Sequence, residues 1–424
     1  MPAATSVRLL PLREALRLAA ALVLTVAAAV LLAVAADAGQ HAFATLRVNW
    51  VWAPLLTVPP LFVILVALGR RLGPGVLGGG VAQVLAAQAA GAPPVRGAVS
   101  LALSKTALTA LAISGGASLG REGPAIQIGA ALFRDLGSES VAGDVRQGPR
   151  LLVWGGIAGV AATFGAPLTA LLFAIEVLRA RFACRGWLLA LLIAVAAAGA
   201  ARALLPSIGV LQVQVLPASA LLPLWSGVLL SAVFAGLLGG ALAHALPFAL
   251  RRARGLLQRY PLWMAAISGL ALALVGLCGA GVHGAGLIEV RAWMAGEGAA
   301  VPGFAVLKTL ATALSTFAAV PGGLVSPAVA IGAGIGVDVA RLVDGLPLAT
   351  AIALGMAAGQ AAILRAPLAS TALVLELLGD YRLLPPLLVA AGLATLLSRR
   401  LCRTRLLDAL AQLARAGAAG AARC

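Results

Sequence analysis

Charged side chains are scarce in this sequence, and their scarcity decides which solvent the folded chain needs. Only 11% of the 424 residues are charged, whereas 62% are hydrophobic and the mean hydropathy is +1.04. A soluble domain of this length needs far more polar surface to cover its core. The composition therefore excludes a soluble globular protein and predicts a chain embedded in lipid.

Cysteine and histidine are also rare. The four cysteines and three histidines are scattered at Cys184, Cys278, Cys402, Cys424, His41, His244 and His283. Their spacing fits neither a disulfide framework nor a metal site. An intramembrane hydrolase would need a histidine base beside a nucleophile, and Ser118 alone does not supply that pair. We therefore expect no metal, no cofactor and no enzymatic activity.

Acidic residues are few, so the chain carries a formal charge of +17. In a soluble protein this charge would suggest nucleic acid as a partner, but here the arginines flank apolar segments. They stand at Arg8, Arg13 and Arg17, Arg70 and Arg71, Arg179, Arg181 and Arg185, Arg251, Arg252, Arg254 and Arg259, and Arg399, Arg400, Arg403 and Arg405. The positive-inside rule predicts that these ends and both termini are cytoplasmic in a multi-pass cell-membrane protein. No nucleic-acid partner is expected.

Long apolar runs are abundant. Several approach the roughly 20 residues of a membrane-spanning helix, namely 17–36, 50–69, 187–204, 222–247 and 261–282. They predict an all-α integral membrane protein, a single membrane domain over 1–424. The arginine-rich start, the first apolar run and Ala35–Ala38 also fit a cleaved signal peptide, but spans throughout the chain favour an uncleaved first helix.

The sequence contains an internal repeat. K-T-A-L-T-A-L at 105–111 matches K-T-L-A-T-A-L at 308–314, and these segments hold the only lysines, Lys105 and Lys308. G-R-E-G-P-A-I-Q-I-G-A at 120–130 matches G-L-V-S-P-A-V-A-I-G-A at 323–333 with the same offset (308 − 105 = 323 − 120 = 203). The A-P-L segment at 165–178 recurs at 365–378, with an offset of 200 (365 − 165). Low complexity does not supply matched lysines, prolines and glutamates.

The repeat divides the chain into a first half at 17–205, a second half at 220–400 and a cytoplasmic C-terminal helix at 401–424. Halves broken by glycine and proline are typical of transporters with an ion site near mid-bilayer. Three arginines follow the first A-P-L helix and one follows the second, which favours inverted repeats. Glu176 and Glu376 are equivalent under the repeat, so we expect both to be structural.

The repeat also places an acidic residue at a helix start. Glu122 lies in G-R-E-G-P, where Pro124 suits the first turn of an apolar helix. Free N–H groups and the helix dipole make such a start an anion site, and 322–327 offers a second one. A carboxylate inside the bilayer is costly, so we predict that Glu122 takes the anion's place, gates the pore and can carry a proton. The alternative is a plain capping carboxylate near a membrane surface.

These segments, with P-G-G-L-V-S-P and the two A-P-L helices, resemble the CLC family of chloride channels and chloride/proton antiporters. The resemblance covers about residues 50 to 410 and is to the prokaryotic type without cytoplasmic CBS domains. It implies a homodimer with one pore per subunit, inverted halves of tilted, broken and re-entrant helices, and an external gate at Glu122. The anion-binding positions that it implies are Gly79, Gly80, Arg121, Gly123, Gly323, Leu324, Val325 and Leu407.

Four positions depart from the family pattern. Gly79 and Leu407 stand where the family has a serine and a tyrosine whose hydroxyls face the anion, Val325 replaces a phenylalanine, and Val177 replaces the internal proton-transfer glutamate. The lost hydroxyls favour channel-like or weakly coupled chloride conduction, with chloride/proton antiport as the alternative. Fluoride selectivity is less favoured because Gly79 offers no ligand. Few acidic residues lie in the apolar segments, which disfavours a cation-coupled transporter of an organic substrate.

Overall fold

The chain folds into helices throughout its described length. In this computed structural model the described residues are 12–73, 75–90, 97–137, 148–208, 211, 221–279, 281–298 and 301–421. The first half contains α1 (Leu12–Asn49), α2 (Ala53–Leu72), α3 (Val81–Ala90), α4 (Ala98–Ser114), α5 (Glu122–Leu136), α6 (Gly148–Phe164), α7 (Pro167–Glu176) and α8 (Cys184–Leu204). The second half contains α9 (Leu221–Arg252), α10 (Arg254–Arg259), α11 (Pro261–Cys278), α12 (Leu287–Met294), α13 (Phe304–Phe317), α14 (Val325–Leu342), α15 (Leu348–Leu364), α16 (Pro367–Leu378), η1 (Tyr381–Leu383) and α17 (Leu384–Leu401), and α18 (Leu406–Ala421) follows. The predicted all-α membrane architecture is confirmed.

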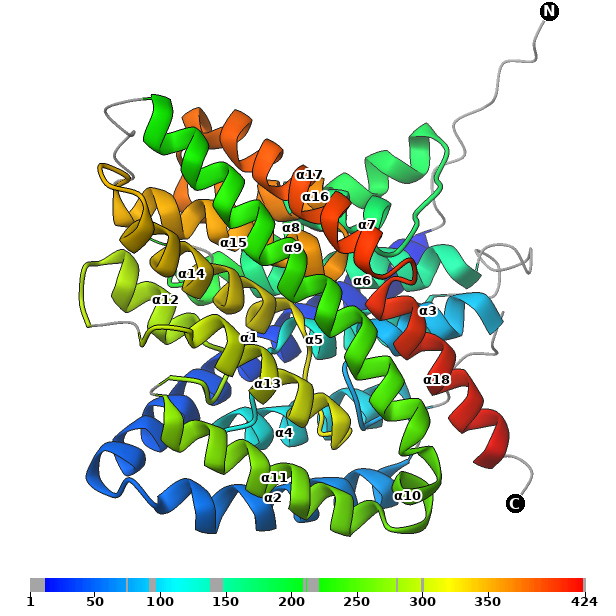
Figure 1. Cartoon of the computed structure of the whole chain (residues 1–424). Helices are drawn as coiled ribbons and strands as arrows, with labels where there is room; N and C mark the ends of the chain where they lie inside the picture. The colour runs from blue at the N-terminus through cyan, green and yellow to red at the C-terminus, as the bar shows by residue number, and fades with distance from the viewer. Residues whose placement is uncertain are drawn as a thin grey trace, which may run out of the picture.

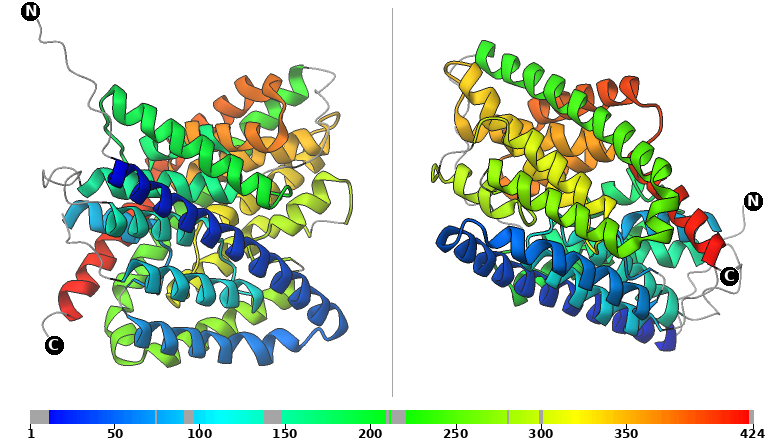
Figure 2. Two further views of the ribbon diagram at one scale, coloured as in Figure 1. Left: turned by 180° about the vertical axis from the view of Figure 1, so that it is seen from behind. Right: turned by 60° about the horizontal axis from the view of Figure 1, so that its bottom comes forward.

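Long apolar helices form the outside of the molecule. Within the described residues, seven segments are long and apolar enough to cross a membrane: α1, α2, α8, α9, α11, α14 and η1 with α17. In six of them only 33–39% of the most apolar stretch is buried, whereas α14 is 78% buried. The six therefore turn most of their apolar side chains outward, as lipid-facing helices do. Figure 1 and the left view of Figure 2 show α2 and α11 along one edge of the molecule.

The first helix is longer than the apolar run predicts. It continues to Asn49 instead of ending near Ala36, so the segment Ala35–Ala38 lies inside it. Asp37 lies inside this helix, and its carboxylate pairs with the Arg121 guanidinium, at 2.7 Å. With this length, α1 runs obliquely across the molecule (Figure 2).

Four helices, α5, α6, α14 and α15, form the buried centre (Figure 1). Within each half, two of them touch at glycines. A Cβ atom on Gly129 would lie 2.2 Å from the carbonyl oxygen of Gly155, and one on Gly332 would lie 2.2 Å from that of Gly355. Lipid provides no hydrophobic force between helices, so this close contact of small residues is what holds each pair together. The duplication therefore extends to the packing of the core.

The two halves are inverted with respect to each other. Glu176, at the end of α7, accepts a hydrogen bond from the backbone N–H of Ala369 at the start of α16 (2.8 Å). Glu376, at the end of α16, accepts one from the backbone N–H of Thr169 at the start of α7 (2.7 Å). Each helix thus ends where the other begins, so the two are antiparallel. The equivalent glutamates satisfy helix N-termini reciprocally, which is the structural role expected for them.

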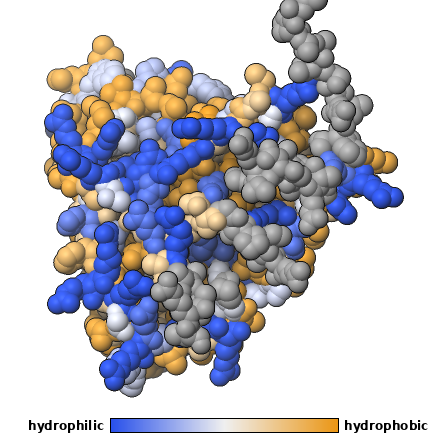
Figure 3. Space-filling model, turned by 90° about the vertical axis from the view of Figure 1, so that its right-hand side faces the viewer, coloured by the Kyte–Doolittle hydropathy of each residue, from blue (hydrophilic) through white to orange (hydrophobic). Residues whose placement is uncertain are grey.

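Basic residues gather on one side of the molecule. The last turns of α2, α9 and α17 carry Arg70 and Arg71, Arg251 and Arg252, and Arg399 and Arg400. These helix ends lie on the right in Figure 1, and Figure 3 shows hydrophilic side chains spread over that side. The sequence pattern predicts such a shared side. Arg8, Cys424 and the last residues of 401–424 lie outside the described residues.

Candidate anion-binding site

Two helix starts from the two halves meet in the centre of the molecule. α5 begins at Glu122, slightly ahead of the start near Pro124 that the sequence predicts, and α14 begins at Val325, ahead of Pro327. Proline has no N–H and its fixed φ suits a first turn, so both prolines favour a helix start at these points. Neither start has a side-chain cap from its own N-cap residue. The backbone N–H groups of both first turns are therefore left for another acceptor.

The carboxylate of Glu122 is that acceptor for α14. The side chain is only 1% exposed. One carboxylate oxygen accepts a hydrogen bond from the backbone N–H of Ser326 (3.2 Å), and the other accepts one from the Ser326 hydroxyl. A negative group thus lies at the N-terminus of the opposite half's helix, where the helix dipole favours an anion.

A short backbone bridge fixes the two helix starts against each other. Gly120 N–H donates to the Gly323 carbonyl (2.7 Å), and Gly323 N–H donates to the Gly120 carbonyl (2.6 Å). The two glycines are equivalent under the repeat, so the internal two-fold axis passes through this bridge. The bridge uses the amide of Gly323, one of the implied anion-binding positions.

Four other amides at the two starts stay free. In the part of the chain that the structure describes, no acceptor pairs with the backbone N–H groups of Arg121, Glu122, Leu324 and Val325. These are the amides that the family resemblance implies for anion binding. Their role remains a prediction, but the geometry leaves them available.

A third loop, ahead of α3, packs onto the two helix starts. A Cβ atom on Gly80 would lie 2.0 Å from the Gly123 carbonyl oxygen, and one on Gly123 would lie 2.0 Å from the Gly79 carbonyl oxygen. Only glycine permits this approach, so these glycines are required for the loops to meet. The amide of Gly80 donates to the side chain of Gln83 (2.7 Å), so it is already satisfied within the protein.

Buried Lys105 holds this third loop in place. Its ammonium group donates to the carbonyl oxygens of Gly75 (3.2 Å) and Gly78 (2.8 Å). Lys308, its equivalent, donates in the same way to the carbonyl oxygens of Val282 (2.9 Å) and Gly284 (2.7 Å). The matched lysines of the sequence repeat therefore have matched structural roles.

Cavities lie on both sides of the helix starts. One, of about 220 Å³, is lined by Gly79, Leu324, Val325 and Leu407 among others, and we call it the apolar cavity. The other holds only about 30 Å³ and is lined by Arg121, Glu122, Phe164 and Met356 among others. The predicted site residues therefore come together, with Gly79, Leu324, Val325 and Leu407 on one cavity and Glu122 on the other.

The apolar cavity offers almost no side-chain donors. Of the described residues that line it, only Gln83 and Thr316 have polar side chains. The Gln83 amide is used within its own loop, donating to the Leu77 carbonyl (2.9 Å), and the Thr316 hydroxyl donates to the Thr312 carbonyl (2.8 Å). Gly79 and Leu407 line the cavity without hydroxyl groups, as their departure from the family pattern predicts.

Two residues of the site could not be predicted as site residues from the sequence. The sequence identifies Ser326 only as part of a helix-start motif. Its signal is the repeat, under which Ser326 is equivalent to Gly123, the residue next to Glu122. Asp37 lies in a stretch that resembles a signal-peptide cleavage region. Its carboxylate pairs with the buried Arg121 guanidinium, so the charge beside Glu122 is neutralised. No local sequence signal joins Asp37 to a residue of another helix.

These features define a multi-pass membrane protein with inverted halves whose helix starts converge on one anionic group. The family model of the voltage gated chloride channel matches residues 61–399. The chain belongs to this family, the CLC proteins, which are anion channels and transporters.

Curated relatives and solved structures agree with this assignment. The voltage-gated ClC-type chloride channel ClcB of Escherichia coli O81 (strain ED1a) is 30% identical over 312 residues, which is 71% of this chain and 73% of that protein. The fold is similar to that of a slow cyanobacterial Cl−/H+ antiporter, with a TM-score of 0.80 at 21% identity over 96% of this chain and 99% of the other. A CLC-type fluoride/proton antiporter gives a TM-score of 0.74 at 25% identity, over 90% of this chain and 94% of the other.

Proposed function

We propose that this protein conducts chloride across the cell membrane through a pore that Glu122 gates. The observation that carries the proposal is the position of the Glu122 carboxylate on the backbone N–H and hydroxyl of Ser326. The start of α14 attracts anions, so the carboxylate occupies the position that a chloride ion would take. Protonation removes the charge that holds it there, and the vacated helix start then accepts an external anion.

The surroundings suit quick release of the anion. The cations nearest the site are already paired, since Arg121 is bound to Asp37 and Lys105 to backbone carbonyls. A dehydrated chloride ion would therefore meet the free amides of the two helix starts and no unpaired positive charge. Full charges in a pore bind anions too tightly for rapid conduction, whereas amide dipoles allow both binding and release.

We favour channel-like or weakly coupled conduction. The apolar cavity has no hydroxyl at Gly79 or Leu407 to close around the anion, and Val177 cannot transfer a proton. Chloride/proton antiport is the second candidate, because two structurally similar proteins are antiporters and Glu122 is present to carry the proton. Water can replace a missing side chain in a proton path, so both candidates use the same gate.

Chloride efflux from liposomes that hold the purified protein tests the proposal. External pH is recorded at the same time, with valinomycin and potassium present to remove the membrane voltage and with no proton ionophore. Chloride efflux without proton movement supports the channel-like mode, and efflux with uphill proton uptake supports antiport. If neither chloride nor fluoride, bromide or nitrate leaves the liposomes, the proposed function is wrong.

We also propose a homodimer with one pore per subunit and cytoplasmic termini, as the family resemblance implies. The gathering of arginines on one side supports this orientation. The mass of the protein in nanodiscs, measured by light scattering, distinguishes a monomer from a dimer. A monomer that still transports chloride would contradict the dimer without affecting the pore.

A further inference from the structure

A further cavity, of about 530 Å³, lies on the arginine-rich side of the molecule. It is bordered by α3, the beginning of α6, the linker between α7 and α8, and α18. Four arginines line it, Arg150, Arg179, Arg181 and Arg415, and we call it the basic pocket. None of its lining residues lines the apolar cavity, whereas five of them, Arg179, Ala180, Arg181, Asp408 and Gln412, also line a neighbouring cavity of about 830 Å³.

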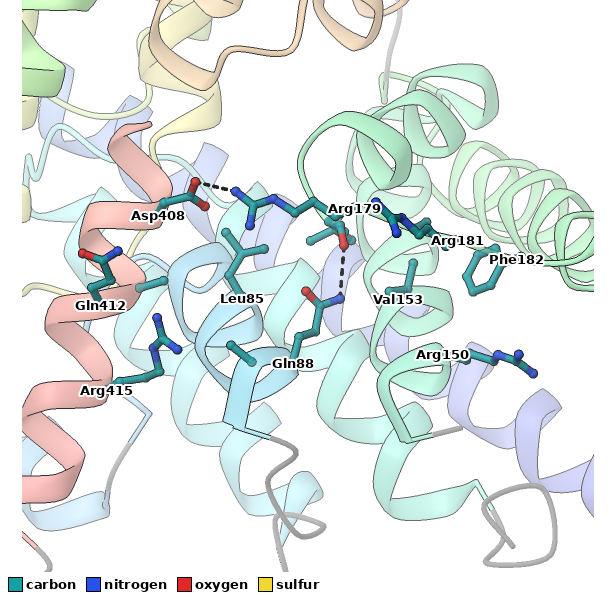
Figure 4. A pocket seen from close by; sticks show the side chains of 14 residues that line it. Leu85, Gln88, Arg150, Val153, Arg179, Arg181, Phe182, Asp408, Gln412 and Arg415 are labelled. Carbon is teal, nitrogen blue, oxygen red and sulfur yellow. Dashed lines mark hydrogen bonds and ion pairs between the residues drawn. The ribbon is translucent and has the colours of Figure 1, made fainter. Parts of the chain in front are cut away.

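The charges of the basic pocket are unbalanced. Asp408 is the one acidic residue among its described lining residues, and it pairs with Arg179. Arg150, Arg181 and Arg415 have no carboxylate partner in the described ranges. Figure 4 shows Arg415 on α18 on one side and Arg179 and Arg181 on the other, with α3 between them, while the Arg150 side chain points outward from the edge of the pocket. An anion would relieve the repulsion among these guanidinium groups.

The backbone at Arg179 gives independent support for a built site. Its φ of 56° lies in the left-handed region, where the chain turns back after α7 and Ala180 N–H donates to the Ala174 carbonyl (2.8 Å). Glycine is the least costly residue at such a turn. An arginine is found there instead, and its side chain reaches Asp408 on α18. At this strained position the arginine side chain joins α18 to the rim of the pocket.

We propose that the basic pocket binds a phosphate-bearing anion with several negative charges, either a soluble polyphosphate compound or the headgroup of a phospholipid. Guanidinium groups match phosphate oxygens in a bidentate way, and several of them around one space are typical of phosphate sites. Gln412 adds a neutral amide to the same rim. The volume is within the range of small-molecule sites.

The bound anion holds α18 in place. Successive turns of α18 present Asp408, Gln412 and Arg415 to the basic pocket, while Leu407, Leu410 and Leu413 line the apolar cavity. The beginning of α18 is already anchored by the Arg179–Asp408 pair and by Arg405, whose guanidinium donates to the Glu176 carbonyl (2.9 Å). An anion bound by both Arg415 and Arg181 anchors the rest of α18. The binding of the anion and the ordering of α18 do not depend on whether the chain transports chloride.

Hydrogen–deuterium exchange on the full chain tests the proposal. The protein is placed in nanodiscs of phosphatidylcholine, and inorganic tripolyphosphate is added; in a second arm, about 20% cardiolipin replaces phosphatidylcholine. We expect slower exchange along Leu406–Ala421 in one of the two arms, because bound ligand lowers the rate of local opening. Protection by tripolyphosphate identifies a soluble ligand, and protection by cardiolipin alone identifies a lipid headgroup.

Two paired variants make the test specific. R181Q/R415Q should lose the protection and weaken binding at least about tenfold, because each lost arginine removes charge-assisted hydrogen bonds. R70Q/R71Q removes the same charge from exposed residues outside the pocket and should behave as wild type. Equal protection in wild type and R181Q/R415Q, or protection in neither arm, would overturn the proposal.

Discussion

Among single residues, Glu122 is proposed both to gate the pore and to carry the proton. E122Q keeps the shape of the side chain and an acceptor for Ser326 N–H but removes the titrating charge. We expect chloride efflux to persist, to lose its dependence on external pH, and to proceed without proton movement. Efflux and external pH recorded together in liposomes check this result.

Glu297 provides the matched control, because it is an exposed glutamate between α12 and α13, away from both cavities. E297Q should leave flux and its pH dependence as in wild type. Retained pH-sensitive flux in E122Q would show that another group gates the pore.

The two buried lysines allow a second comparison at this scale. K105M and K308M each remove a buried ammonium donor from backbone carbonyl oxygens, those of Gly78 and Gly284 among them, so both should destabilise the protein by about 1–3 kcal/mol. Only the Lys105 loop continues into Gly79 on the apolar cavity. We therefore expect K105M alone to change chloride flux per folded protein, with thermal unfolding in detergent as the measure of stability. Equal flux defects in both variants would contradict a positioning role specific to Lys105.

Among the elements, the central helix pairs depend on their glycine contacts. In G332A the new methyl group would meet the Gly355 carbonyl oxygen at 2.2 Å, so α14 and α15 must separate. We expect a loss of stability of about 1–3 kcal/mol or more, seen as a lower unfolding midpoint. Gly255 in α10 has open space where a methyl group would lie, with no atom within 4 Å, so G255A should be tolerated. A stable G332A variant would mean that the helices can separate without cost.

The features that the sequence predicts best are those of which the repeat contains two copies. The matched helix starts and the paired Glu176 and Glu376 could be predicted because equivalent positions in inverted halves face each other. The contact of Glu122 with Ser326 could not, since it crosses from one half to the other and depends on the angle between α5 and α14. The basic pocket also could not be predicted, because Arg150 and Arg415 are far apart in the chain and line one cavity only through tertiary packing.

For the whole molecule, the orientation in the membrane can be tested, that is, which side faces the cytoplasm. α8 begins at exposed Cys184, close to the basic-pocket residues Arg181 and Phe182, whereas α11 runs from α10 to the opposite side and ends at exposed Cys278 (Figure 1). A chain that keeps only Cys278, its other cysteines changed to serine, should react with a membrane-impermeant maleimide in intact cells. A chain that keeps only Cys184 should react in inside-out vesicles.

The same orientation decides which solution controls the gate. The small cavity at Glu122 and the apolar cavity at Leu407 lie on different sides of the helix starts, and α18 links the second to the arginine-rich side. If that side is cytoplasmic, Glu122 takes its proton from outside, so lowering external pH should raise chloride flux more than lowering internal pH does. Flux measured with each side of oriented vesicles titrated separately checks this asymmetry. Greater sensitivity to internal pH, together with reversed cysteine labelling, would mean that the molecule has the opposite orientation in the membrane.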